Sequence, residues 1–178
     1  MAENITRQVS AAEITFDPDG TPIVFTPDMG GTVITYSLSL ADVFEEPHGN
    51  LPVDKISSGF DGSPMIAAPL ATMTALRLKE IFGVTEDTNE YLLQNSNGES
   101  LKEGAQKVVV KPMVNNVADP DESTWIWFPL GSRPVFRSLS HTYDRAGQRV
   151  WQVEIYGFPG TEVGYEGVPI VIGQNAPI

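Results

Sequence analysis

Alternating apolar and polar residues recur in short stretches along most of the chain, and Gly, Pro, Asn and Asp separate these stretches. The clearest stretch is 32–40, in which Ile, Tyr and Leu at every second position alternate with Val, Thr and Ser. A period of two residues is typical of a β-strand with one buried face. The pattern therefore predicts a mainly β, antiparallel protein.

Two further pairs of stretches predict hairpins. Residues 14–20 and 22–26 flank a Pro-Asp-Gly turn, which lacks the further oxygen ligands and the closing Glu of a calcium loop, so we expect a plain turn. Residues 135–143 and 148–156 form the second pair. In its second strand, three apolar residues alternate with Gln152 and Glu154, which predicts a sheet with one side in water.

A third hairpin is expected from 91–95 and 106–111, with Lys107 and Lys111 at outer positions. It ends at Pro112, and an acidic loop follows.

The next stretch, 124–128, predicts a strand that carries Trp125 and Trp127 on one face. A pair of tryptophans two residues apart can stack on a sugar, which makes a glycan site one interpretation of this strand. Packing in the core or against another subunit is the other.

One stretch has helical rather than strand periodicity. Residues 69–82 place Pro69 at the first helical position and are followed by a Gly suited to end the helix, and their apolar stripe fits packing against a sheet. Met73 and Leu76 lie off this stripe. They are either ordinary surface residues or contacts with another subunit.

A long segment, 41–63, combines Pro and Gly with carboxylates and predicts a loop, whose length indicates either disorder or a function. Residues 1–13 and 159–178 are expected to be terminal arms around a domain at 14–158. The C-terminal segment is apolar and rich in Gly and Pro, so it either adds an edge strand to its own sheet or docks on a neighbouring chain. The carboxylates of the long loop that are candidates for a function are Asp42, Glu45, Glu46, Asp54 and Asp61.

Charge is unevenly distributed over the chain, which has 23 acidic and 11 basic side chains and a net charge of −12. Tight binding of nucleic acid is disfavoured, because it needs clustered Lys and Arg. The acids could equally serve solubility alone. Much of the positive charge falls near the hairpin at 135–156, where copies stacked head to tail could pair it with the acidic first 70 residues. Its arginines are Arg133, Arg137, Arg145 and Arg149.

The residues needed for catalysis are scarce. The chain has no Cys and two His, His48 and His141, and it contains none of the motifs of serine hydrolases, P-loop proteins, zinc proteases or dinucleotide-binding enzymes. We therefore expect no enzyme activity, no cofactor and no metal. The N-terminal sequence lacks a signal peptide, and no apolar run approaches about 18 residues, so we expect no membrane span.

This layout resembles the tail tube proteins of long-tailed bacteriophages. The likeness spans about residues 14–158 and rests on the strand at 32–40, the acidic loop at 41–63, the helix at 69–82 and the closing strands around Trp127 and Trp151. The resemblance implies an antiparallel β-barrel or sandwich with one flanking helix. It also implies hexameric rings that stack into a hollow tube, which conducts DNA during ejection.

For individual residues, the resemblance implies that the five loop carboxylates serve ring stacking or line the lumen. The arginines near 135–156, together with Met73 and Leu76, would contact other subunits. The partners would be further copies of the chain, other tail proteins and DNA that passes without specific binding. The protein would be assembled in the host cytoplasm and reside in the virion tail.

Two alternatives belong to other classes of protein. A carbohydrate-binding β-sandwich, such as an adhesin or a tail-fibre module, would present Trp125 and Trp127 as exposed platforms. Another virion component, such as a tail terminator or a capsid decoration protein, would share the composition and the acidity. Glycan binding separates the first alternative from a tube protein, and assembly geometry separates the second.

Overall fold

The computed structural model describes residues 3–9, 11–27, 31–43, 54–70, 81, 100–140 and 150–173. Of residues 3–9, 58, 136–140 and 150 it describes the backbone alone. Strands account for most of these residues. The strands are β1 (Glu3–Val9), β2 (Ala12–Phe16), β3 (Ile23–Phe25), β4 (Thr32–Val43), β5 (Asp54–Phe60), β6 (Met65–Leu70), β7 (Gln106–Val114), β8 (Val117–Ala118), β9 (Ile126–Gly131), β10 (Val135–Ser140), β11 (Val150–Phe158) and β12 (Val171–Ile172); a short 3-10 turn, η1, covers Glu122–Thr124.

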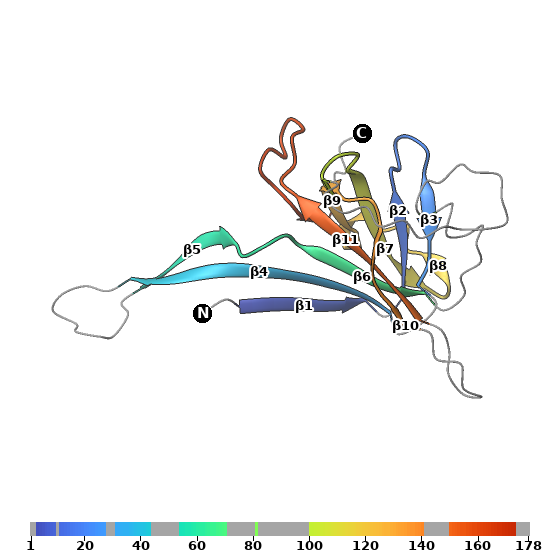
Figure 1. Ribbon diagram of the computed structural model, residues 1–178, viewed down its shortest axis with the longest axis horizontal. Coiled ribbons are helices and arrows are strands. Elements are labelled where there is room, and N and C mark those ends of the chain that lie inside the picture. The colour runs from blue at the N-terminus through green and yellow to red at the C-terminus, as the bar shows by residue number, and fades with distance from the viewer. Residues whose placement is uncertain are drawn as a thin grey trace.

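The strands form one continuous antiparallel sheet with the order β1-β4-β6-β11-β9-β7-β2-β3 (Figure 1). Four further strands pair beside this path: β5 with β4, β8 with β7, β10 with β11 and β12 with β9. The prediction of a mainly β, antiparallel protein is confirmed. Its finer form, a barrel or a sandwich, stays a prediction, because the path through the described strands is open.

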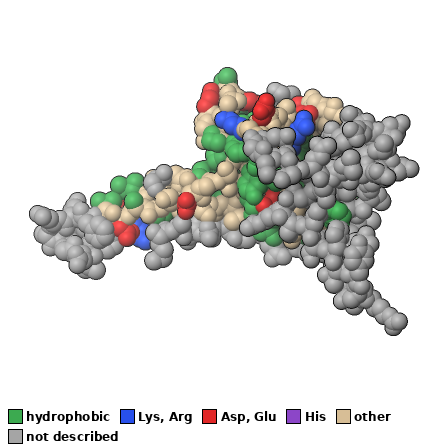
Figure 2. All heavy atoms as spheres, viewed as in Figure 1, with side chains coloured by type: hydrophobic (Ala, Val, Ile, Leu, Met, Phe, Trp, Pro, Cys, Tyr) green, Lys and Arg blue, Asp and Glu red, His purple; other side chains and the backbone are tan. Residues whose placement is uncertain are grey.

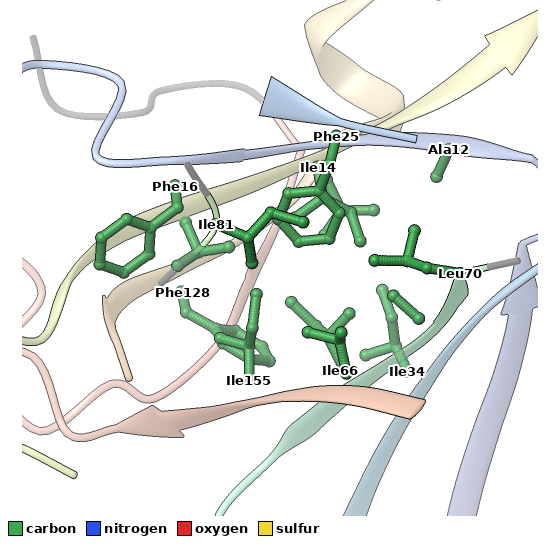
Figure 3. Packing of buried hydrophobic residues seen from close by; sticks show 14 of the residues in the cluster. Ala12, Ile14, Phe16, Phe25, Ile34, Ile66, Leu70, Ile81, Phe128 and Ile155 are labelled. Carbon is green, nitrogen blue, oxygen red and sulfur yellow. The ribbon is translucent and has the colours of Figure 1, made fainter. Parts of the chain in front are cut away.

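The core lies between two parts of this sheet that face each other. Ile14 of β2 and Phe128 of β9 come from one part, and Ile34 of β4 and Ile66 of β6 from the other; all four are fully buried (Figure 3). Burying one such side chain contributes about 1.5–3 kcal/mol to folding. Alternation explains the cluster, because every second residue of each strand points to the same side.

Strand β11 joins the two parts. Its residues from Trp151 to Tyr156 pair with β6, whereas Gly157 and Phe158 pair with Gly131 and Leu130 of β9. Trp151, Val153 and Ile155 face the core as predicted. The expectation that Glu154 faces water is wrong: it is 3% exposed and accepts a hydrogen bond of 2.6 Å from the hydroxyl of Tyr156.

The predicted start of the helix at Pro69 is wrong. Pro69 and Leu70 end strand β6, and Pro69 is the register partner of Gln152 in β11. Ile81 is helical and belongs to the core cluster. The flanking helix itself stays a prediction. Residues 71–80 and 82, including Met73 and Leu76, lie outside the described residues.

The predicted loop at 41–63 is also largely wrong. Residues 41–43 extend β4, and Asp54–Phe60 form β5, which pairs with β4 from Leu38↔Phe60 to Val43↔Asp54. The register shifts between Ser39 and Leu40, where Ser58 of β5 has no partner on β4. This bulge interrupts the alternation of β5, while that of β4 continues. Residues 44–53 lie outside the described part.

Both ends of the described chain belong to the sheet. Glu3–Val9, expected within an N-terminal arm, forms β1 and pairs with β4. At the other end, Val171 and Ile172 form β12 and pair with Trp127 and Ile126 of β9. Of the two alternatives for the C-terminal segment, an edge strand on its own sheet is confirmed for these two residues.

Candidate functional site

The most unusual surface is a hairpin that extends away from the two facing parts of the sheet (Figure 1). We call it the projecting hairpin and define it as residues 36–43 of β4 together with β5. On β4, only Val33–Thr35 pair with β6, whereas Leu38–Val43 pair with β5. Among the described strands, β4 pairs from Ser39 onward with β5 alone, so this part of the hairpin is a two-stranded extension, whereas residues 36–38 of β4 pair with β1.

The core-facing side of β4 continues along this hairpin. Ile34 is fully buried, Tyr36 is partly buried against the core, and Leu38 and Leu40 follow on the same side. Leu38 is paired across the hairpin with Phe60, which is 40% exposed. An apolar strip therefore runs from the core through the half-buried Leu38 and Leu40 to the exposed Phe60.

Three of the five candidate carboxylates lie on or beside the projecting hairpin. Asp42 forms an ion pair of 3.6 Å with Lys55, and both side chains are largely exposed. Asp54 is exposed and accepts a hydrogen bond of 2.7 Å from the backbone N–H of Lys55. Asp61 follows β5 directly and is exposed. Figure 2 shows acidic side chains at separate places along the hairpin. Asp42 and Asp54 therefore lie together at one end of the hairpin, whereas Asp61 lies at the other end of β5. Glu45 and Glu46 lie outside the described residues.

Of the candidate arginines, Arg133 is the one whose side chain the structure describes. It is exposed, and its Nε would lie 3.3 Å from a Cβ placed on Gly104, so it rests on the turn that precedes β7. Arg137 is in β10, of which the backbone is described. Arg145 and Arg149 lie outside the described residues, as do His48 and His141.

A face of β7 and β9 has a lysine and tryptophan arrangement that the sequence did not predict. Lys107, expected at an outer position, is 7% exposed; its ammonium nitrogen lies 3.0 Å from Asp19 Oδ2 and 5.8 Å from the centre of the Trp127 ring. The ammonium nitrogen of Lys111 lies 4.7 Å from the centre of the Trp125 ring and 3.6 Å from Glu13 Oε1. The sequence contained two clues to this arrangement: two lysines that lie four residues apart on β7, and two tryptophans that lie two residues apart near β9.

The same face is covered by the C-terminal segment. Tyr165 packs edge-on against Trp127, with 4.9 Å between the ring centres, and Trp127 is 1% exposed. Trp125 precedes β9 and donates its indole N–H to the backbone oxygen of Asp119 at 2.8 Å. Trp127 is therefore packed within the chain beside Tyr165, and its burial removes it as an exposed sugar platform.

An acidic turn leads into β9. Asp121 caps the 3-10 turn by accepting a hydrogen bond of 3.0 Å from the backbone N–H of Ser123. Hydrogen bonds from the side chain and then the backbone of Ser123 lower the pKa of Asp121 below its ordinary value. This arrangement stabilises the turn, because an N-cap carboxylate satisfies an N–H group that has no partner in the helix.

In the part of the chain that the structure describes, no three His, Asp or Glu side chains lie close enough together to hold a metal ion. In the turn between β2 and β3, the carboxylate of Asp17 accepts a hydrogen bond of 3.2 Å from the backbone N–H of Thr21. None of the described helical residues forms a helix long and apolar enough to cross a bilayer. Comparison with protein-family models and with curated proteins finds no match for the chain.

Proposed function

We propose that this chain is a structural subunit of a virion, which assembles with copies of itself into the tail tube of a long-tailed bacteriophage. The subunits form hexameric rings, and the rings stack into a hollow channel for DNA. The subunit works without a cofactor and catalyses no reaction. It assembles in the host cytoplasm and contacts other tail proteins as well as its own copies.

The observation that carries this proposal is the apolar strip on the projecting hairpin. The strip begins at Ile34 in the core and continues along β4 to Leu38. It ends at Phe60, which is paired with Leu38 and is 40% exposed. Exposed apolar surface that continues from a core, on a projecting hairpin, is typical of a surface that another protein covers. A neighbouring copy is the covering partner that the tube proposal requires.

Exposed strand edges support the same conclusion. Among the described strands, β5 pairs with β4 alone and β1 pairs with β4 alone, so each has an edge that no described strand covers. Such edges recruit strands of other chains. When neighbouring subunits of a ring pair through these strand edges, the edges form a defined interface and are no longer open to other chains.

The glycan-binding alternative loses its main support because Trp127 is buried under Tyr165. A tail terminator or a decoration protein shares the acidity and the fold class with a tube subunit. Assembly geometry separates them, since a terminator forms one ring and a tube subunit forms stacked rings.

Negative-stain electron microscopy of the purified chain at several milligrams per millilitre tests the proposal. We expect rings and hollow tubes with a bore wide enough for duplex DNA. The variant Phe60→Ser should assemble less than the natural chain while its melting temperature stays within a few degrees. Val163→Ser is the matched control, because Val163 is 92% exposed on a different surface.

A protein that stays monomeric at these concentrations contradicts the proposal. Single rings without tubes would favour the terminator alternative. Equal assembly of Phe60→Ser and Val163→Ser would show that the apolar strip is not the interface.

A further inference from the structure

The chain contains two Asp-Pro peptide bonds, Asp17-Pro18 and Asp119-Pro120, and both lie in turns between strands. Such a bond carries its own nucleophile, because the aspartate carboxyl group can reach the carbonyl carbon of the same residue and close a small ring. The proline nitrogen belongs to a tertiary amide and leaves readily once it is protonated. The surroundings of each bond therefore decide how easily it breaks.

The backbone of Asp119 is fixed between β8 and η1. Its N–H donates to the carbonyl oxygen of Pro112 at 2.7 Å, and its carbonyl oxygen accepts the indole N–H of Trp125 at 2.8 Å. This carbonyl belongs to the Asp119-Pro120 bond. A donor at such a distance stabilises the negative charge that develops on the oxygen when the carbonyl carbon is attacked.

The carboxylate of Asp119 is held as well. Its Oδ1 accepts a hydrogen bond of 3.0 Å from the backbone N–H of Asp121, and its Oδ2 accepts a longer one of 3.4 Å from the hydroxyl of Thr124. Both donors follow the Asp119-Pro120 bond in the chain. The nucleophile and the carbonyl group are thus both restrained, which lowers the entropy that their reaction has to lose.

The Asp17-Pro18 bond is held less closely. The carbonyl oxygen of Asp17 accepts the N–H of Gly20 at 3.3 Å, and Asp17 Oδ2 accepts the N–H of Thr21 at 3.2 Å. These distances lie at or beyond the long end of ordinary N–H···O hydrogen bonds. The two bonds have the same chemistry in different surroundings, so Asp17-Pro18 is an internal reference for Asp119-Pro120.

We propose that the folded chain cleaves itself at Asp119-Pro120 in mild acid. A carboxyl oxygen of Asp119 attacks the carbonyl carbon of the same residue, the C–N bond to Pro120 breaks, and the proline nitrogen takes a proton from solvent. Water then opens the cyclic anhydride, which restores the side-chain carboxyl group and leaves a new C-terminal one. The indole of Trp125 stabilises the charged carbonyl oxygen during the attack. This single self-cleavage turns over no substrate and goes beyond the proposed function.

The fragments should stay together after cleavage. Residues 1–119 and 120–178 become separate chains, yet β9 of the second fragment pairs with β7 of the first, and β11 pairs with β6. Pro120 and Asp121 are exposed, so water reaches the bond. The product is a nicked subunit with a new N-terminus at Pro120, and it becomes visible only after denaturation.

Mass spectrometry under denaturing conditions tests this inference after incubation of the full chain for several days at a pH of about 4, close to the ordinary pKa of aspartate. Circular dichroism at the same pH checks that the chain is folded. We expect fragments 1–119 and 120–178 to form at least about tenfold faster than fragments 1–17 and 18–178. In urea at the same pH, the excess cleavage at Asp119 should disappear, because unfolding removes the indole donor.

Three variants assign the cause. Trp125→Phe keeps an aromatic ring and removes the indole donor, so cleavage at Asp119 should slow towards the rate at Asp17. Asp119→Glu moves the carboxyl group further from the carbonyl carbon and should abolish the fast cleavage. The matched control is Asp17→Glu, which makes the same change at the reference bond and should leave the rate at Asp119 unchanged.

Two results overturn the inference. The first is cleavage at Asp119 that is absent from the folded chain or no faster than cleavage at Asp17. The second is a folded Trp125→Phe variant that breaks the bond at the natural rate. Fast cleavage that requires Trp125 and is lost in urea supports it. The tube proposal is independent of these results, because it concerns assembly.

Discussion

The ammonium nitrogen of Lys107 lies 3.0 Å from Asp19 Oδ2, although the lysine side chain is 7% exposed and the aspartate side chain 66% exposed. A buried cation thus reaches a carboxylate at the surface, across the turn that joins β2 to β3. The long stem of lysine makes this possible, because it packs along apolar neighbours while its charged end approaches solvent.

Removal of the carboxylate should destabilise the protein modestly. We expect Asp19→Ala to lower the free energy of unfolding by about 1 kcal/mol, since the exposed aspartate is screened by water. Lys107→Met keeps the stem and removes the charge, so its effect should stay within about 1 kcal/mol. Urea unfolding measures both. Glu13→Ala, which removes the 3.6 Å partner of Lys111, is the control and should cost less than Asp19→Ala.

The two tryptophans near β9 should differ in their contribution to stability. Trp127 is buried, so Trp127→Ala should lower the free energy of unfolding by about 3–5 kcal/mol. Trp125→Phe keeps a ring but removes the hydrogen bond to Asp119, at a cost of about 1 kcal/mol. Thermal unfolding followed by circular dichroism compares them. Equal losses would contradict the different burial of the two rings.

A close contact at Gly131 gives a prediction about core packing. A Cβ at this position would lie 2.5 Å from Val108 Cγ2, so Gly131→Ala should destabilise the protein by about 1–3 kcal/mol. In the double variant with Val108→Ala, the added methyl group occupies space that the smaller side chain leaves. We therefore expect the double variant to lose less stability than the two single losses added together. Additive losses in chemical denaturation would show that the clash is relieved elsewhere.

The capped turn before β9 gives a pH-dependent signature. Hydrogen bonds from Ser123 hold the pKa of Asp121 below its ordinary value of 3.8 in the folded protein. The stabilisation is therefore fully present above that value and is lost as the pH falls through the folded pKa. Ser123→Ala should raise the pKa of Asp121 towards 3.8, which nuclear magnetic resonance titration of its carboxyl carbon measures. An unchanged pKa in this variant would contradict the assigned cause.

The sequence predicted most strands because their alternation is local. Strands form within the predicted stretches 14–20, 32–40, 106–111 and 148–156, and Trp151, Val153 and Ile155 face the core as expected. The prediction that Glu154 faces water was wrong. Tyr156, two residues along the same face, donates a hydrogen bond from its hydroxyl to the carboxylate, and this partner makes burial of the carboxylate tolerable.

Pro69 shows why the helix boundary was wrong. Proline is suited to the first turn of a helix, but it is equally tolerated in a strand where no neighbour needs its missing N–H. Strand β4 pairs with β6 only from Met65 to Ala67, so Pro69 lies beyond that pairing. The difference depends on where a distant strand ends, which the local pattern does not contain.

The candidate surface was predicted in part. Asp42, Asp54 and Asp61 were selected for their charge, and the structure places all three on or next to one hairpin. The expected loop is instead a pair of strands, because pairing between β4 and β5 overrides the weak strand propensity of the Ser-Ser-Gly segment before Phe60.

Strand β11 makes the two facing parts of the sheet mechanically dependent on each other. A pull on the projecting hairpin would pass through β4 and β6 into β11, whose last two residues are hydrogen-bonded to β9. Tension along this route loads several backbone hydrogen bonds in shear, so no single bond carries the whole force. A molecule with such a route would transmit strain from its hairpin to its far side before any strand separated.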